Sequence, residues 1–332
     1  MTTLVIATPD AVLLARQGQS WALEAHLEGM KATAVAADEN AGRLYVGTSG
    51  NGLFRSVDGG RTWDAVSLAH DDITALAVQA NTAGDGVVYA GTSPSTFWRS
   101  EDGGESWQEM TAMLELPSSS EWSFPPQPHT HHVRCIEPDP HVAGKLYVAI
   151  EAGALLRAED GGETWRDRVP GGPYDTHTAA AHRQAPGRVY SSAGDGYYES
   201  ADGGENWTRQ MDGLHHRYLV GVAVDPGDPA TVVVSAARGP GVSYYAGAAQ
   251  AYVYRKSAGG PFALAMDGLP AAEGTVASLF ATHPAQPGAF YAANNHGLFH
   301  SADAGRSWQA LPIAWPEGVF RNRVSGGVVF RA

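Results

Sequence analysis

An eight-residue pattern recurs along the chain and constrains its fold more than any other feature. Its clearest copy runs from Ser56 to Trp63 and reads Ser-x-Asp-x-Gly-x-x-Trp. An aspartate followed by glycine favours a tight turn, because the carboxylate can accept nearby backbone N–H groups and glycine adopts positive φ. Four further copies end at Trp107, Trp165, Trp207 and Trp308, the second with Ala158 in place of the serine, and two degenerate copies end at Trp21 and Phe262. The pattern predicts a repeat protein with one such turn in each unit.

The spacing of these aromatic anchors indicates what each unit is. Neighbouring anchors are 42 to 58 residues apart, which is the period of a four-stranded propeller blade. One unit can be divided into expected strands at 73–78, 87–92, 97–100 and 106–110, with the octapeptide between the last two. The sequence therefore predicts an all-β, seven-bladed β-propeller of four-stranded antiparallel blades.

The two chain ends indicate how the ring closes. The first unit begins at its second strand, residues 4–7, and the chain ends in a strand-like segment at 324–331. Pairing these segments would remove two exposed sheet edges. We therefore expect a single domain over residues 1–332, in which the first blade is shared between 1–28 and 319–332.

The octapeptide resembles the Asp-box, or bacterial neuraminidase repeat. Proteins with this repeat include sialidases, xyloglucan-degrading glycosidases, the receptor sortilin and a photosystem II assembly factor. The resemblance implies a propeller fold. It implies a glycosyl-hydrolase-like or a binding function without choosing between them, because one fold hosts many functions.

Charge and composition exclude several classes of partner. The formal net charge is −13, and no run of lysine and arginine is long enough to follow a phosphate backbone, so neither nucleic acid nor an anionic membrane is an expected partner. The single cysteine, Cys135, excludes an internal disulfide. The first residues lack the features of a signal peptide and no apolar stretch is long enough to span a membrane, which predicts a cytoplasmic protein.

Two insertions indicate where a site would lie. If each octapeptide joins a third to a fourth strand, the second-to-third loops and the links between blades emerge at the other rim. We call the octapeptide side the repeat rim and the other side the distal rim. Residues 114–131 and 236–251 are long insertions, both expected at the distal rim, where loops on a rigid scaffold commonly bind ligands. The first carries two aromatic residues, Trp122 and Phe124, that can stack on a sugar or close over a ligand; the alternative is an Ω-loop that packs its own Trp122.

Histidines precede or enter the inner strands of three consecutive predicted blades, so they are expected to converge near the axis. Imidazoles and a carboxylate can hold a divalent metal such as Zn or Mn, or act as acid and base near neutral pH. The predicted metal ligands are His132, His177 and His216. The predicted catalytic residues are His177, Asp175, His216 and Tyr218, and the predicted ligand-binding residues are Arg134, Arg217, Arg323, Trp122 and Tyr244.

Several functions fit these residues. A glycosidase needs two carboxyl groups roughly 5 to 10 Å apart, and the sequence pairs none of its candidates, which are Asp71, Asp72, Glu121, Glu151, Asp175 and Asp195. A sialidase would need an arginine triad, but the predicted blade number exceeds the six typical of that family and its Arg-Ile-Pro motif is missing. The leading expectation is a glycosyl-hydrolase-like propeller that binds and processes a carbohydrate at the distal rim. A protein- or peptide-binding propeller and a metal-assisted polysaccharide lyase are the alternatives.

Overall fold

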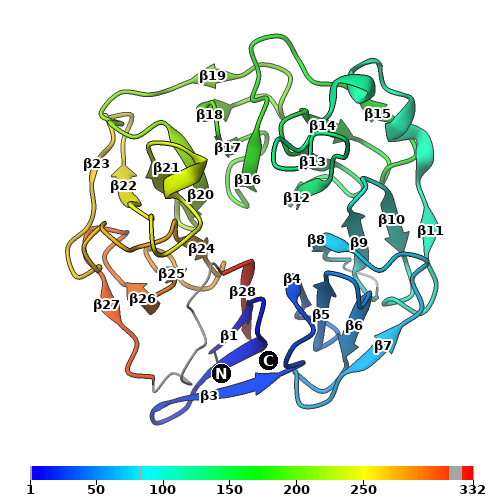
Figure 1. Ribbon diagram of the computed structural model, residues 1–332, viewed down its shortest axis with the longest axis horizontal. Helices are drawn as coiled ribbons and strands as arrows, with labels where there is room; N and C mark the ends of the chain where they lie inside the picture. Colours follow the sequence, from blue (N-terminus) through cyan, green and yellow to red (C-terminus); the bar gives the residue numbers. More distant parts are fainter. Residues whose placement is uncertain (1, 82–83, 314–323, 332) are drawn as a thin grey trace.

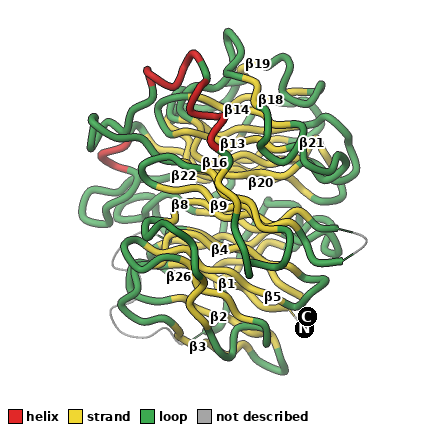
Figure 2. The backbone as a smooth tube through the Cα atoms, turned by 90° about the vertical axis from the view of Figure 1, so that its right-hand side faces the viewer, coloured by secondary structure: helices red, strands yellow, loops and turns green. Residues whose placement is uncertain are grey.

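The computed structural model describes residues 2–81, 84–313 and 324–331. Figure 1 shows sheets arranged in a ring around a central axis, and Figure 2 shows the strands from the side, with loops on both faces. Seven four-stranded antiparallel sheets form the ring, which confirms the predicted all-β, seven-bladed β-propeller. Among the described residues there is no α-helix, and none of their helical segments is long and apolar enough to cross a membrane.

The blades that follow the first are listed here from the inner strand outward. The second contains β4 (Ala32–Asp38), β5 (Arg43–Thr48), β6 (Leu53–Ser56) and β7 (Asp64–Val66), and the third contains β8 (Ile73–Gln79), β9 (Val87–Thr92), β10 (Phe97–Ser100) and β11 (Gln108–Glu109). The fourth contains β12 (Val133–Pro138), β13 (Leu146–Ile150), β14 (Ala154–Ala158) and β15 (Trp165–Arg166), and the fifth contains β16 (Thr176–Ala181), β17 (Val189–Ala193), β18 (Gly196–Ser200) and β19 (Thr208–Arg209). The sixth contains β20 (Tyr218–Asp225), β21 (Asp228–Ala237), β22 (Tyr252–Lys256) and β23 (Ala263–Leu264), and the seventh contains β24 (Leu279–Ala281), β25 (Phe290–Asn294), β26 (Gly297–Ser301) and β27 (Gln309–Ala310).

The first blade is assembled from both ends of the chain. Its sheet runs in the order β28 (Gly326–Arg331), β1 (Thr2–Ala7), β2 (Val12–Gln17) and β3 (Trp21–His26). Strand β28 pairs antiparallel with β1 from Thr2↔Arg331 to Ala7↔Gly326, and the two ends lie side by side in Figures 1 and 2. The expected closure by pairing of the terminal segments is confirmed.

The octapeptide turns owe their shape to a shared set of hydrogen bonds. The Ser56 hydroxyl donates to Asp58 Oδ1 and accepts the Gly60 N–H, each at 2.8 Å, while Asp58 Oδ1 accepts the N–H groups of Arg61 and Thr62 at 2.9 and 3.0 Å. Gly60 has φ +89°, and a Cβ there would lie 2.3 Å from Leu14 of the preceding blade. Serine, aspartate and glycine at these positions therefore shape the turn and allow it to pack against the sheet of the preceding blade.

The turns also connect neighbouring blades. Arg55 and Tyr45 of the second blade both donate to the carbonyl of Gly103 in the next turn, at 2.9 and 3.1 Å. The anchor Trp165 packs edge-on against Phe97 of the preceding blade, with ring centroids 5.1 Å apart. Each octapeptide is thus an inter-blade contact on the repeat rim.

The insertions leave the sheets at the distal rim, as the alternation of strand direction requires. The link between β11 and β12 contains the short 3₁₀ turns η1 (Thr111–Glu115) and η2 (Pro117–Glu121). The loop between β21 and β22 contains η3 (Pro240–Val242).

Candidate functional site

Polar side chains from the fourth, fifth and sixth blades meet at the distal end of the inner strands. These side chains come from the start of β12, the β13–β14 loop, the start of β16, the start of β20 and the β21–β22 loop. The distal cluster, as we name it, comprises His132, Arg134, Glu151, Asp175, His177, Tyr218 and Tyr244. The sequence analysis predicted six of these seven as site residues.

Glu151 lies between two cationic or hydrogen-bonding groups of the same blade. One of its carboxylate oxygens, Oε2, is 3.0 Å from His132 Nε2 and 3.2 Å from Arg134 Nε. Burial alone would raise the pKa of this carboxyl, but the His132 hydrogen bond and the Arg134 charge lower it to about 2. Glu151 is therefore ionised at neutral pH.

His177 is fully enclosed, and its hydrogen bonds define its tautomer. Its Nδ1 lies 2.5 Å from the carbonyl oxygen of Leu219, which can only accept, so Nδ1 carries the proton. Burial lowers the pKa of His177, which favours the neutral ring. Its free Nε2 then accepts from the Tyr218 hydroxyl at 3.2 Å, and that hydroxyl lies 3.2 Å from the Tyr244 hydroxyl.

Asp175 is in a different electrostatic environment from Glu151. Its Oδ1 accepts the Ala152 N–H at 2.9 Å, and its Oδ2 lies 3.7 Å from His177 Nε2. Burial raises the pKa of Asp175 above its ordinary value, although the neighbouring His177 acts in the opposite direction. The two carboxyl groups are thus biased toward opposite protonation states.

One nitrogen and two carboxylate oxygens of the cluster are close enough to share a metal ion. Ligand atoms of Glu151, Asp175 and His177 all lie within 4.8 Å of one another. This set differs from the predicted one, because His216 is absent and Glu151 takes part.

Small cavities connect the cluster with the central axis. A cavity of about 80 Å³ is lined by His132, Arg134 and Tyr244, and a neighbouring one of about 160 Å³ by Arg134 and His177. Two aromatic rings pack against members of the cluster: half-buried Phe124 lies edge-on to His132 with ring centroids 4.7 Å apart, and the Tyr244 ring packs against Tyr218.

The structure corrects the placement of three predicted residues. The His216 ring stacks on Tyr252 at a centroid distance of 4.0 Å and its Nδ1 lies 2.6 Å from the Tyr254 hydroxyl, so it faces the third strand of its own blade. Trp122 is only 6% exposed and donates from Nε1 to Ser118 Oγ, so it packs within the insertion and offers no stacking surface. Arg217 is exposed and makes no ion pair or side-chain hydrogen bond within the described residues. Arg323 lies outside the described residues.

Glu151 is the residue whose pairing at the site sequence reasoning missed. The sequence analysis named Glu151 among six candidate carboxyl groups but could not say which two form a pair. The feature that could have identified it is its position immediately after a buried second strand. Phe124 lies in the same insertion as Trp122, and only the packing distinguishes the two rings.

No protein-family model matches the sequence, and no curated protein matches it. Among solved structures, an ancestral GH74 enzyme is similar over 100% of this chain and 40% of its own, with 15% identity and a TM-score of 0.64. The GH74 enzyme of Niastella koreensis is similar over 96% of this chain and 52% of its own, with 18% identity and a TM-score of 0.70. This chain therefore spans about half the length of these enzymes or less.

A third similar structure is a binding protein. YCF48 bound to D1 peptide is similar over 92% of this chain and 84% of its own, with 16% identity and a TM-score of 0.56. At these identities the likenesses show the fold alone. They establish that the chain has the seven-bladed β-propeller fold found both in GH74 enzymes and in YCF48.

Proposed function

We propose that this chain is a carbohydrate-processing propeller that hydrolyses a glycosidic bond at the distal cluster, with Glu151 and Asp175 as the reacting pair. The observation that carries the proposal is the pairing itself. Carboxylate oxygens of the two residues lie within 4.8 Å of each other, while the pKa of Glu151 is lowered to about 2 and that of Asp175 is raised. Two neighbouring carboxyl groups in opposite protonation states are what glycoside hydrolysis requires.

The short separation favours the retaining mechanism. Retaining glycosidases hold their carboxyl groups roughly 5 Å apart, whereas inverting enzymes leave room for water with a larger gap. Ionised Glu151 would attack the anomeric carbon while protonated Asp175 gives its proton to the departing oxygen. Water would then release the sugar from Glu151, with Asp175 now accepting the water proton.

The remaining members of the cluster have supporting roles in this proposal. Arg134 and His132 orient Glu151, and neutral His177 places no positive charge beside Asp175, whereas an imidazolium there would favour the ionised carboxylate. Phe124 and Tyr244 provide apolar surface for a sugar ring. The octapeptide's resemblance to the Asp-box repeat, and the GH74 structures with the same fold, support a carbohydrate ligand.

A panel of 4-methylumbelliferyl glycosides and xyloglucan oligosaccharides tests the proposal. We expect turnover of at least one substrate, and a loss of at least about 10²-fold in kcat in Glu151→Gln and Asp175→Asn, the range of acid–base contributions. Glu121→Gln, which removes an exposed carboxylate of the insertion, is the matched control and should keep full activity. Activity should fall as pH rises through the raised pKa of Asp175, because the acid must be protonated. If no substrate is turned over, or Glu151→Gln remains active, the hydrolase proposal is wrong.

A divalent metal is a second candidate for the same cluster, favoured by the three ligand atoms of Glu151, Asp175 and His177 within 4.8 Å. Nitrogen and carboxylate oxygen ligands suit Zn or Mn. Elemental analysis decides between the candidates. A stoichiometric metal that is lost in His177→Ala and retained in His216→Ala would favour a metal-assisted reaction, including lyase chemistry, over the metal-free mechanism. A metal-free chain that is inactive on the panel but retains a peptide would instead favour binding, as in YCF48 bound to D1 peptide.

A further inference from the structure

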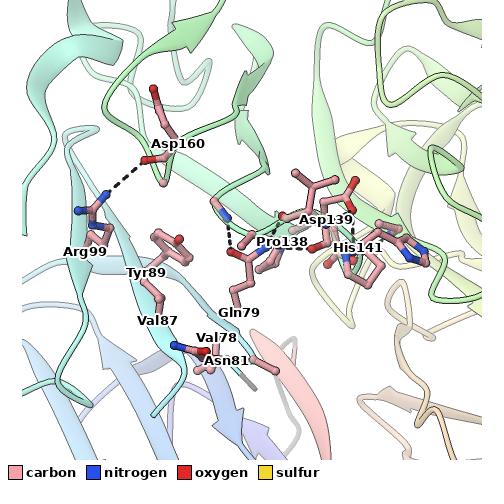
Figure 3. Close-up of a pocket in the computed structure, with 18 of the residues that line it drawn as sticks. Val78, Gln79, Asn81, Val87, Tyr89, Arg99, Pro138, Asp139, His141 and Asp160 are labelled. Carbon is pink, nitrogen blue, oxygen red and sulfur yellow. Dashed lines mark hydrogen bonds between the residues drawn. The ribbon is translucent and has the colours of Figure 1, made fainter. Parts of the chain in front are cut away.

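A cavity bounded by described residues lies on the repeat rim, away from the distal cluster. It has a volume of about 740 Å³ and lies between the third and fourth blades, with Ala181 and Arg183 of the fifth at its edge. Its wall includes Glu137 near the end of β12, whereas Arg134 of the distal cluster is near the start of that strand. The polar residues on which the argument depends are Gln79, Tyr89, Arg99, Glu137 and Arg183. Figure 3 shows this cavity, with the ring of Tyr89 between Arg99 and Gln79.

Tyr89 differs from the tyrosines at the same position in four other blades. Each occupies the same place in a second strand, and in the other four the hydroxyl donates to an oxygen: Tyr45 to Gly103 at 3.1 Å, Tyr147 to Asp139 at 3.0 Å, Tyr190 to Pro229 at 2.6 Å and Tyr291 to Gln286 at 3.4 Å. Tyr89 is 1% exposed and borders the cavity, and its hydroxyl has no partner among the described residues. Because this hydroxyl borders the cavity, it is available to bond a molecule that enters it.

Two polar side chains near this hydroxyl, Arg99 and Gln79, already bond other groups of the protein. Arg99 donates to the carbonyl of Asp160, as the dashed line in Figure 3 marks, and pairs with Glu101 at 3.0 Å. Gln79 uses its amide nitrogen on the carbonyls of Asp139 and Val142, and its amide oxygen on the Gly144 N–H. Neither Arg99 nor Gln79 can therefore turn toward Tyr89 without breaking another bond.

Charges of both signs border the cavity: the guanidinium groups of Arg99 and Arg183, and the carboxyl groups of Glu101, Glu137, Asp139 and Asp160. Arg99 is matched by Glu101 and Glu163. Exposed Arg183 makes no ion pair within the described residues, but its charge acts on the half-buried carboxyl of Glu137, which also accepts the Ala181 N–H at 2.8 Å. A strongly anionic or cationic ligand would meet a like charge here, so a neutral ligand fits best.

We propose that this cavity is a second ligand site, specific for a neutral, hydroxyl-rich molecule of the size of a short oligosaccharide. The Tyr89 hydroxyl and the Arg183 guanidinium supply hydrogen bonds, and the Glu137 carboxyl bonds ligand hydroxyls. Val78, Pro138 and Pro140 give the apolar surface that the carbon face of a sugar needs. The volume lies within the range of about 300–1,000 Å³ typical of small-molecule sites. This inference does not rest on the proposed hydrolysis at the distal rim.

Calorimetric titration with cellotetraose, maltotetraose, xylotetraose and chitotetraose tests this site. We expect at least one probe to bind, with an affinity that Tyr89→Phe lowers about five- to tenfold, the effect of one hydrogen bond. Tyr45→Phe is the matched control, because it removes a hydroxyl at the same strand position that bonds within the protein and does not border the cavity. It should bind the probe as the unmodified chain does.

Two further variants separate this site from the distal cluster and from general loss of fold. Arg183→Ala changes an exposed side chain and should weaken binding of the same probe. Glu151→Gln should leave it unchanged, because Glu151 is at the other rim. The proposal is overturned if none of the four probes binds, if Tyr89→Phe binds with unchanged affinity, or if binding is lost in Glu151→Gln and kept in Arg183→Ala.

Discussion

The half-buried carboxyl groups of Glu137 and Glu151 differ in protonation because their neighbouring groups differ. Glu137 at the repeat-rim end of β12 is half-buried, accepts one backbone N–H, and has only the distant charge of Arg183 to stabilise its anion. Burial raises its pKa from 4.5 to about 7. Glu151 at the other end, equally enclosed, has two direct partners and a pKa of about 2. At the residue scale, hydrogen-bond partners therefore decide whether a buried acid is charged.

Replacing Glu137 with glutamine should stabilise the protein at alkaline pH. A folded-state pKa above the unfolded value favours folding below pH 4.5, and this contribution is lost as pH rises through about 7. Glu137→Gln should therefore unfold like the unmodified chain at pH 4 and be more stable by about 3 kcal/mol at pH 8. Urea unfolding at both pH values measures this difference in the free energy of unfolding. Exposed Glu109→Gln is the control, and an equal gain at both pH values would contradict the prediction.

At the scale of one element, the octapeptide turn with Ala158 lacks a bond that the other clear copies have. In those copies the serine hydroxyl accepts the N–H of the second glycine at 2.8 to 2.9 Å. Ala158 is buried and has no oxygen to accept the Gly162 N–H. This turn is therefore expected to be the weakest of the five.

Restoring the serine should strengthen that turn. Ala158→Ser supplies the missing acceptor for Gly162 and a donor for Asp160, and we expect a gain of about 1 kcal/mol in the free energy of unfolding. The reverse change in an intact turn, Ser200→Ala, should cost a similar amount. Denaturant unfolding of both variants measures the two changes in the free energy of unfolding. A destabilised Ala158→Ser would show that the site has no room for the hydroxyl.

At the scale of the whole molecule, β28 is the one strand that joins the two ends of the chain in one sheet. Without it the first blade has three strands and β1 has an unpaired edge beside the axis, a template for aggregation. A chain truncated after Ser325 should therefore lose its cooperative thermal transition or elute as aggregate in size-exclusion chromatography. A chain ending at Arg331, which keeps β28, is the control. A truncated chain that remains monomeric and unfolds at the same temperature would show that closure does not stabilise the ring.

The sequence by itself determined the blade number, the position of the octapeptide turns, and most strand bounds. The expected strands at 73–78, 87–92 and 97–100 correspond to β8, β9 and β10, while the outer strand is shorter than expected at Gln108–Glu109. These features could be predicted because they depend on local turn chemistry and on a period repeated along the chain.

Only the tertiary structure decided which side chains meet at the distal rim. Register shifts lie near the start of five inner strands, among them β12 between Val133 and Cys135 and β16 between Thr176 and Thr178, and they change which residues face the axis. In the folded chain Glu151 meets Asp175, while His216, one of three histidines expected to converge, turns toward Tyr252 and Tyr254. A strand's side chains alternate between two faces, so a shift of one residue moves a side chain into or out of the site. Repetition thus determines the ring, but the site depends on single-residue register, which is fixed by packing between blades.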